Sequence, residues 1–183
     1  AMKEMNVKDF EFSQNYVLFW DKLERANFFL ESIIETADRG VDDRTVAFLL
    51  DKPLVDGGQW HMFVNIVGKY GLVPQPFMPE TQSSSSTRRM NSILYTLLRR
   101  AARELRELAA RSAPLERIRE HKEKTLSVVH RILSIHLGTP PSEFVWQWTD
   151  KDRKFHREEN TTPVEFARRH LGVSPDQYVC LVN

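Results

Sequence analysis

The sequence predicts an α+β protein that is mostly helical and carries one small β-ribbon. Two observations support this fold class. Apolar residues recur every three or four positions along several segments, which is the spacing of one helix face. The spacing then changes to two over residues 144–149, where Phe144, Trp146 and Trp148 alternate with more polar neighbours. Alternation of this kind is typical of a strand with one buried face.

The first half of the chain is expected to hold three helices. Ser13 is a suitable N-cap for the first helix, and Gly71 is a suitable C-cap for the third. Residues 73–79 contain three prolines, so this segment is expected to be extended. The three helices are expected at about 13–38, 43–50 and 59–70.

The second half is expected to hold a long helix pair, a hairpin and a final helix. An apolar stripe runs from Met90 to Leu108, and Pro114 suits the first turn of a following helix that reaches about residue 137. These two helices are expected to be antiparallel. Thr162 and Glu165 form a capping-box pattern ahead of the final helix. The hairpin is expected as a strand at 144–149, a turn at 150–153 and a return strand at 154–157, and a further strand is expected at 178–182.

Composition places the chain among globular proteins. Of its 183 residues, 41% are apolar and 28% are charged, and the net charge is +1. No run of 18 apolar residues occurs, so no transmembrane helix is expected. The first residues lack the apolar core of a signal peptide, and a single cysteine excludes an internal disulfide. The expected compartment is therefore the cytoplasm.

Charge is distributed unevenly along the chain. Residues 1–80 carry 8 Lys/Arg and 13 Asp/Glu, a net charge of −5, whereas residues 81–183 carry 18 and 12, a net charge of +6. A polar run at 82–87, which we expect to be a loop, lies where the balance changes. We therefore predict a boundary between two regions, 1–81 and 82–183.

The span 88–131 is the most basic part of the chain. It holds 12 Lys/Arg against 5 Asp/Glu. One interpretation is a solvated helix face with Glu104 and Glu107 as local partners. The other is an electrostatic footprint for nucleic acid or an acidic partner, with binding carried mostly by phosphate contacts.

Candidates for nucleophilic, metal and cofactor chemistry are few. Cys180 lies in an apolar run, which favours a buried thiol of low reactivity over a thiolate nucleophile. None of the six histidines has the spacing of a zinc site, and no phosphate-binding glycine motif occurs. No cofactor and no metal are therefore expected.

Two adjacent glycines offer a stronger functional hypothesis. Gly57 and Gly58 follow Asp56 and precede Trp60 at the start of a predicted helix. Glycine lets a second backbone approach closely, which a peptide-binding cleft requires. A tight turn without any ligand is the alternative interpretation.

Several blocks of sequence carry a family resemblance. They are Asp9-Phe10-Glu11-Phe12-Ser13-Gln14-Asn15-Tyr16, Phe19-Trp20-Asp21-Lys22-Leu23-Glu24, the glycine segment, Lys69-Tyr70-Gly71-Leu72-Val73-Pro74, Met78-Pro79-Glu80-Thr81, Thr87-Arg88-Arg89-Met90-Asn91, Asp150-Lys151-Asp152, Thr162-Pro163-Val164-Glu165-Phe166 and Cys180-Leu181-Val182-Asn183. In this order they resemble the bleomycin hydrolase and aminopeptidase C family, a branch of the papain-like cysteine peptidases. The resemblance covers essentially the whole chain. The family's Gly-Arg-Cys-Trp nucleophile motif is absent from these residues, as is its upstream glutamine. By the family's order, its catalytic histidine and asparagine would also lie outside residues 1–183.

The resemblance implies a cysteine aminopeptidase that removes N-terminal residues from peptides through an acyl-enzyme. It implies that residues 1–81 form the helical half of a papain-like core, where Gly57 and Gly58 bind substrate backbone and Trp60 flanks the adjacent pocket. Residues 82–183 would be an inserted helical and hook region that serves assembly into a hexameric ring. This chain alone would be inactive. The alternative is a non-enzymatic interaction or nucleic-acid-binding module that uses the basic helices at 88–131.

Overall fold

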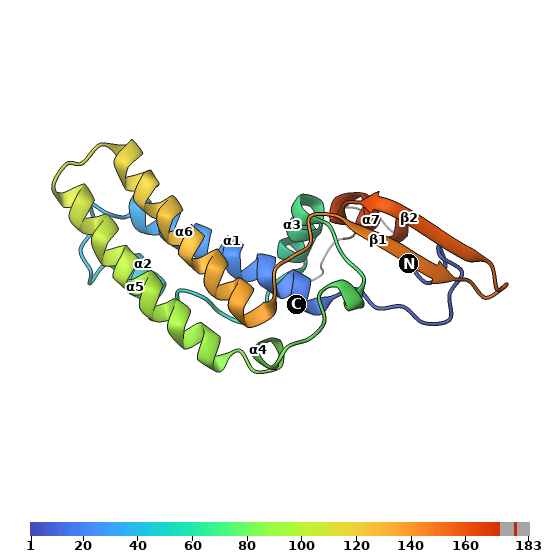
Figure 1. Ribbon diagram of the computed structural model, residues 1–183. Helices are drawn as coiled ribbons and strands as arrows, with labels where there is room; N and C mark the ends of the chain where they lie inside the picture. Colours follow the sequence, from blue (N-terminus) through green and yellow to red (C-terminus); the bar gives the residue numbers. More distant parts are fainter. Residues whose placement is uncertain (173–177, 179–183) are drawn as a thin grey trace. The chain divides into compact units, whose positions relative to one another are not determined.

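The computed structural model describes residues 1–172 and Tyr178, and it is mostly helical, as predicted (Figure 1). Two strands pair into one antiparallel hairpin. The elements are α1 (Gln14–Glu35), α2 (Arg44–Asp51), α3 (Trp60–Tyr70), a 3₁₀ turn (Gln75–Phe77), α4 (Gln82–Ser85), α5 (Arg88–Ala110), α6 (Leu115–Leu137), β1 (Phe144–Thr149), β2 (Phe155–Thr161) and α7 (Pro163–His170).

Residues far apart in the sequence group into two compact units. The first contains 1–21, 58–81 and 137–183, and the second contains 22–57 and 82–136. One passage between the units falls at residues 81 and 82, where the sequence predicts a boundary. Each unit nevertheless combines pieces from both sides of that position. The assignment of 1–81 and 82–183 to a peptidase core and an inserted region stays a prediction.

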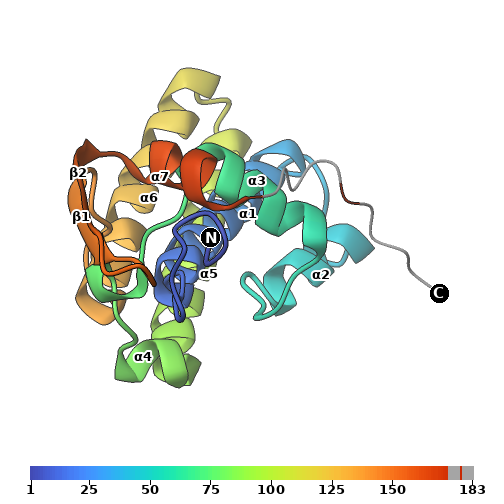
Figure 2. The ribbon, with the colours of Figure 1, turned by 90° about the vertical axis from the view of Figure 1, so that its right-hand side faces the viewer.

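The first unit is built around an aromatic cluster and around the contact of α3 with α7. Figure 2 shows these two helices side by side. Phe166 of α7 is fully buried, and its ring lies 5.3 Å from that of Phe144 and 6.0 Å from that of Trp146. Gly71 ends α3 with a φ of 75°. A Cβ at this position would lie 2.1 Å from the backbone of Pro163, so only glycine lets the two segments approach this closely.

Polar side chains near the start of α1 tie the three pieces of the first unit together. The amide of the buried Asn15 donates to the carbonyls of Pro79 and Leu137, at 2.8 Å and 2.7 Å. The Tyr16 hydroxyl donates to the Tyr70 carbonyl at 2.6 Å. Burial raises the pKa of Tyr16 to about 12. As predicted, Ser13 caps α1 by accepting the Tyr16 N–H at 3.0 Å.

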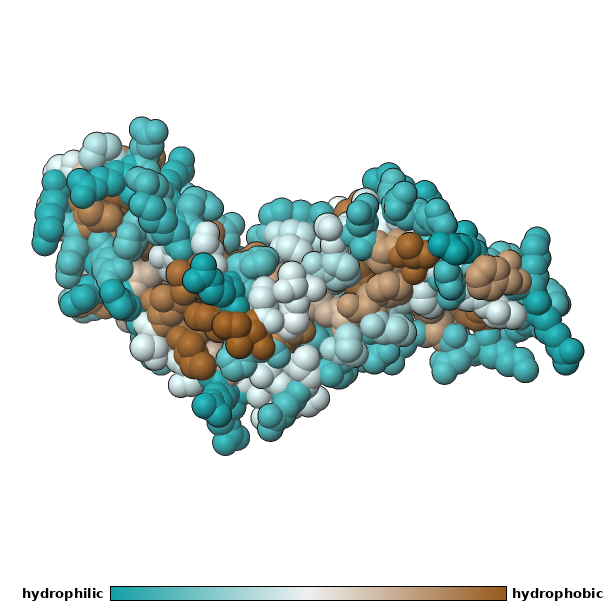
Figure 3. Space-filling view, viewed as in Figure 1, coloured by the Kyte–Doolittle hydropathy of each residue, from teal (hydrophilic) through white to brown (hydrophobic). Residues whose placement is uncertain are grey.

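The second unit packs the later turns of α1 against the helix pair α5 and α6. Its core consists of apolar side chains from all three helices, including Phe29, Leu30, Ile33, Leu94, Leu98, Leu105, Val129 and Leu133. A buried ammonium adds an ionic contact, since Lys122 donates to Glu31 at 2.7 Å. Polar residues cover most of the visible surface, and an apolar patch lies over α5 and α6 (Figure 3). The exposed apolar side chains of this pair include Ile93, Val128 and Ile135.

Four expectations from the sequence need correction or fall outside the described residues. The proline-rich segment 73–79 is not extended throughout, because Gln75–Phe77 forms a 3₁₀ turn. Gln82–Ser85 is one helical turn, where the sequence predicts a polar loop. The return strand β2 is longer than predicted and continues to Thr161. The strand expected at 178–182 lies, apart from Tyr178, outside the described residues, as does Cys180.

Candidate functional site

The structure places the two predicted substrate-binding glycines on an exposed segment between α2 and α3. Gly57, the last residue of one stretch of the second unit, has a φ of 84° and is exposed. Gly58 follows it directly, is also exposed and belongs to the first unit. A side chain at Gly57 would be strained at this φ. The backbone conformation therefore favours glycine at this position.

The space around Gly57 is open. A Cβ built on Gly57 would meet no heavy atom within 4 Å. The carbonyl of Gly57 accepts a hydrogen bond from the Arg25 guanidinium of α1. One backbone group of the glycine pair is thus already engaged within the protein, while the Cβ side of the residue faces free space.

Trp60 is the first residue of α3 and is 37% exposed. Its ring lies 5.5 Å from that of Phe63 and 6.2 Å from that of Tyr178. Aromatic contacts on two sides limit the orientations open to the indole and leave part of it accessible to solvent. The structure therefore places an accessible aromatic surface two residues after the glycine pair.

The residue before the glycines has a role that the sequence does not predict. The carboxylate of Asp56 accepts hydrogen bonds from Lys22, from Thr87 at 2.9 Å and from Asn91 at 3.1 Å. Burial raises the pKa of Asp56, but the hydrogen bond and charge of Lys22, with the bonds from Thr87 and Asn91, outweigh this effect and lower it. One signal was available, because Lys22 falls on the apolar stripe of α1 between Phe19 and Ala26.

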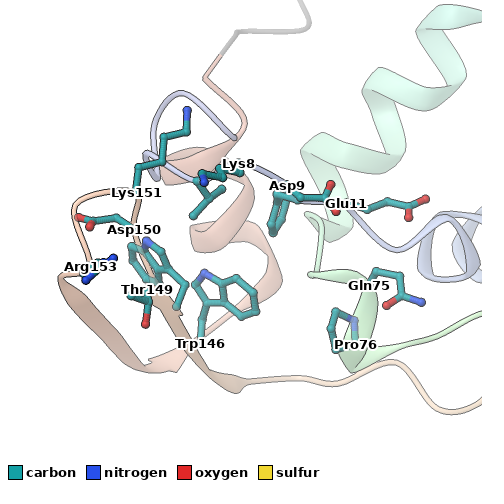
Figure 4. Close-up of a pocket in the computed structure, with 13 residues that line it drawn as sticks. Lys8, Asp9, Glu11, Gln75, Pro76, Trp146, Thr149, Asp150, Lys151 and Arg153 are labelled. Atoms are coloured by element: carbon teal, nitrogen blue, oxygen red, sulfur yellow. The ribbon is translucent and has the colours of Figure 1, made fainter.

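Two cavities of similar size lie elsewhere than at the two glycines themselves. One, of about 640 Å³, is lined by Asp56, by residues just ahead of α5 and by residues of its first half, including Thr87, Arg88 and Arg99. The other, also of about 640 Å³, lies between the N-terminal segment and the end of the hairpin (Figure 4). Neither is lined by Gly57, Gly58 or Trp60.

The hairpin cavity has an aromatic wall and balanced charge. Trp146 and Trp148 line it, and the indole N–H of Trp146 is buried without a hydrogen-bond partner among the described residues. Its basic lining residues are Lys8, Lys151 and Arg153, and its acidic lining residues are Asp9, Glu11 and Asp150. With three charges of each sign, the lining carries no net formal charge.

Most of the arginines in the middle of α5 are committed to partners inside the second unit. Arg99 donates to the carbonyls of Leu50 and Asp51, and Arg106 donates to the carbonyls of Thr36 and Arg39. Arg100 and Arg103 form ion pairs with Glu104 and Glu107, one helical turn further on. These contacts favour the interpretation of a helix face with local partners over that of a nucleic-acid footprint.

Within residues 1–172 and Tyr178, no group of three or more His, Cys, Asp or Glu side chains could hold a metal ion. No helix in the described part of the chain combines the length and the apolar character needed to cross a bilayer.

Comparison with known proteins gives a consistent result. Residues 1–183 match the model of the peptidase C1-like family. The chain is 40% identical over 181 residues to aminopeptidase C of Lactobacillus delbrueckii subsp. lactis, covering 99% of this chain and 40% of that protein. It is 42% identical over 186 residues to bleomycin hydrolase of Gallus gallus, covering all of this chain and 41% of the relative.

A solved structure agrees with these relatives. The crystal structure of PepW from Lactobacillus rhamnosis superposes with a TM-score of 0.92 at 43% identity, covering 96% of this chain and 39% of that chain. The chain thus spans about two fifths of the length of these two relatives. The resemblance to bleomycin hydrolase and aminopeptidase C is confirmed, and the chain belongs to the peptidase C1-like family.

Proposed function

We propose that this chain is the substrate-binding part of a cysteine-type aminopeptidase that removes N-terminal residues from peptides through an acyl-enzyme. Gly57 and Gly58 would pair with the substrate backbone, and Trp60 would flank the pocket for the residue before the scissile bond. The observation that carries the proposal is the exposed glycine pair, with a positive φ and open space at Gly57, directly ahead of an accessible indole. Relatives named aminopeptidase C and bleomycin hydrolase support the reaction class.

The arrangement fits recognition of an extended peptide. A substrate backbone needs unhindered N–H and C=O groups at hydrogen-bond distance, which residues with a Cβ tend to obstruct. The ring of Trp60 adds apolar contact area at small conformational cost, because it is already packed on Phe63. Backbone pairing would fix the register of the peptide, and the aromatic surface would contact one of its side chains.

The test uses the complete peptidase that contains this chain. Gly58→Val should obstruct the approach of the substrate backbone and lower kcat/KM for an aminoacyl fluorogenic substrate by about 100-fold, with the melting temperature nearly unchanged. Gly68→Val is the matched control, because Gly68 is an exposed glycine of α3 with no heavy atom within 4 Å of its Cβ position. Equal kcat/KM values for the two variants would contradict the proposal and leave the glycine pair with only a structural role in a turn.

The proposal extends to the setting of the enzyme. We infer a peptidase that acts in the cytoplasm and assembles as a hexameric ring, on the strength of the family resemblance. Exposed apolar side chains such as Ile135 and Phe155, at 75% and 61% exposure, are compatible with intersubunit contacts. Binding of the basic helices to nucleic acid stays a prediction. It has less support because several arginines of α5 have partners inside the second unit.

A further inference from the structure

The segment that leads into the glycine pair is held by side chains from other elements. Among the described residues, the backbone of 53–57 makes no hydrogen bond to another backbone group. The Tyr95 hydroxyl donates to the Leu54 carbonyl, and Arg25 donates to the Gly57 carbonyl. Segments without secondary structure hold one conformation only when such contacts define it. The position of Gly57 therefore depends on side chains of α1 and α5.

Asp56 is the centre of these contacts. Lys22 has a fully buried side chain, and its ammonium donates to the Asp56 carboxylate and to the Val55 carbonyl at 3.4 Å. A buried ammonium is costly without an acceptor, so Lys22 requires a carboxylate at this place. The cost of displacing Asp56 is thus the cost of leaving a buried cation unpaired.

Two further donors fix the orientation of the carboxylate. Thr87, just ahead of α5, donates to one oxygen, and Asn91, in the first turn of α5, donates to both oxygens. With Lys22 on α1, the carboxylate is held by donors from two elements. Three donors leave a carboxylate little freedom to rotate or shift, and all of these contacts lie inside the second unit.

We propose that Asp56, held by Lys22, Thr87 and Asn91, is a positioning residue for substrate binding. It fixes the backbone that enters Gly57, the member of the glycine pair that lies in the same unit. Asp56 itself does not contact the substrate. The inference rests on the proposed function of the glycine pair. It adds that substrate affinity depends on an ion pair set one residue before the glycines.

The experiment measures KM and kcat separately in the complete peptidase. Asp56→Ala should raise KM by about tenfold and change kcat much less, because a misplaced glycine pair weakens backbone pairing in the ground state and the transition state alike. Asp56→Asn keeps an acceptor for Lys22 but loses part of the network, so its KM should fall between those of the wild type and Asp56→Ala. Such graded rescue follows from positioning and not from a general loss of stability.

A matched control separates positioning from stability. Glu31 also accepts from a buried lysine of the second unit, Lys122, and from Arg119. Glu31→Ala removes a comparable ionic contact away from the glycine segment, so it should lower the melting temperature and leave KM unchanged. Equal KM values for Asp56→Ala, Glu31→Ala and the wild type would overturn the proposal.

Two further outcomes are informative. If Asp56→Ala does not fold, Thr87→Val removes one donor without changing the side-chain shape and should still raise KM by a few-fold; an unchanged KM would then refute the proposal. If Gly58→Val raises KM and the Asp56 and Thr87 variants do not, positioning fails while the proposed function stands. If Gly58→Val leaves the kinetics unchanged, the proposed function fails, and the positioning role fails with it.

Discussion

At the residue scale, Gly71 shows how one position can serve two purposes. Its φ of 75° ends α3, as the sequence predicts from its place after the helix. The same residue lets the chain reach Pro163, whose carbonyl accepts the Leu72 N–H at 3.0 Å. The cap is a local property that a sequence pattern reveals. The close approach to Pro163 cannot be seen in a sequence pattern, because it joins positions about 90 residues apart.

A substitution at Gly71 should reveal both effects. Gly71→Ala introduces strain at a positive φ and places a methyl group 2.1 Å from backbone that cannot move aside freely. We expect a loss of about 3 kcal/mol or more in the free energy of unfolding, measured by urea denaturation. Gly138→Ala is the control, since Gly138 has a φ of 90° and no atom within 4 Å of its Cβ position. It should cost about 1 kcal/mol, and equal losses would contradict a steric role for Gly71.

At the element scale, the hairpin and α7 follow from local rules that a sequence displays. The capping box at Thr162 and Glu165 forms as predicted, with both reciprocal hydrogen bonds present. Long periodic helices such as α1, α5 and α6 lie where their apolar stripes place them. The short elements at Gln75–Phe77 and Gln82–Ser85 were missed, because a single turn offers no period to recognise and depends on neighbouring contacts.

The turn of the hairpin contains a carboxylate whose contribution depends on pH. Asp150 accepts from His156 at 2.8 Å and from the backbone N–H groups of Lys154 and Asp152. The hydrogen bond from His156, followed by the backbone bond from Lys154, lowers the pKa of Asp150 below its ordinary value of 3.8. A lowered pKa stabilises the fold above the ordinary value and loses this effect as the pH falls through the lowered one.

Replacement of this carboxylate should therefore reduce the stability of the fold more near neutral pH than in acid. Asp150→Asn should lower the urea midpoint at about pH 6 and have a smaller effect in acid, once the pH has fallen through the lowered pKa and the wild-type carboxyl has lost its charge. Glu143→Gln, at an exposed carboxylate just before β1, controls for net charge. A difference between Asp150→Asn and the wild type that is the same at both pH values would show that the charge has no role.

At the scale of the whole molecule, family and general fold class are the properties that sequence predicts well. Ordered blocks such as Lys69-Tyr70-Gly71-Leu72-Val73-Pro74 identify the family, and the comparisons confirm it. The contacts that hold the backbone of the candidate site are not predictable from the sequence in this way. The contacts of Lys22 and Thr87 with Asp56 join segments more than 30 residues apart, so no window of sequence contains them. A lysine in an apolar stripe signals that a partner exists without identifying it.

One prediction concerns the whole chain. Covalent catalysis requires a nucleophile and a base within about 3 Å, and the family's nucleophile motif is absent from residues 1–183. The purified chain should release no product from an aminoacyl fluorogenic substrate, whereas the complete peptidase assayed beside it should. Turnover by the chain that disappears in Cys180→Ser would contradict this expectation and make Cys180 a nucleophile.

The discontinuous composition of the first unit has a consequence for synthesis on the ribosome. The second unit has all of its residues once His136 has emerged, whereas the first cannot close until α7 follows. During that interval Phe166 and Ala167 are not yet available. In the folded protein these residues pack against Phe12, Val67 and Leu72. The apolar faces of the last three are uncovered until then. We therefore expect these apolar residues to be prone to premature association while the hairpin is being translated.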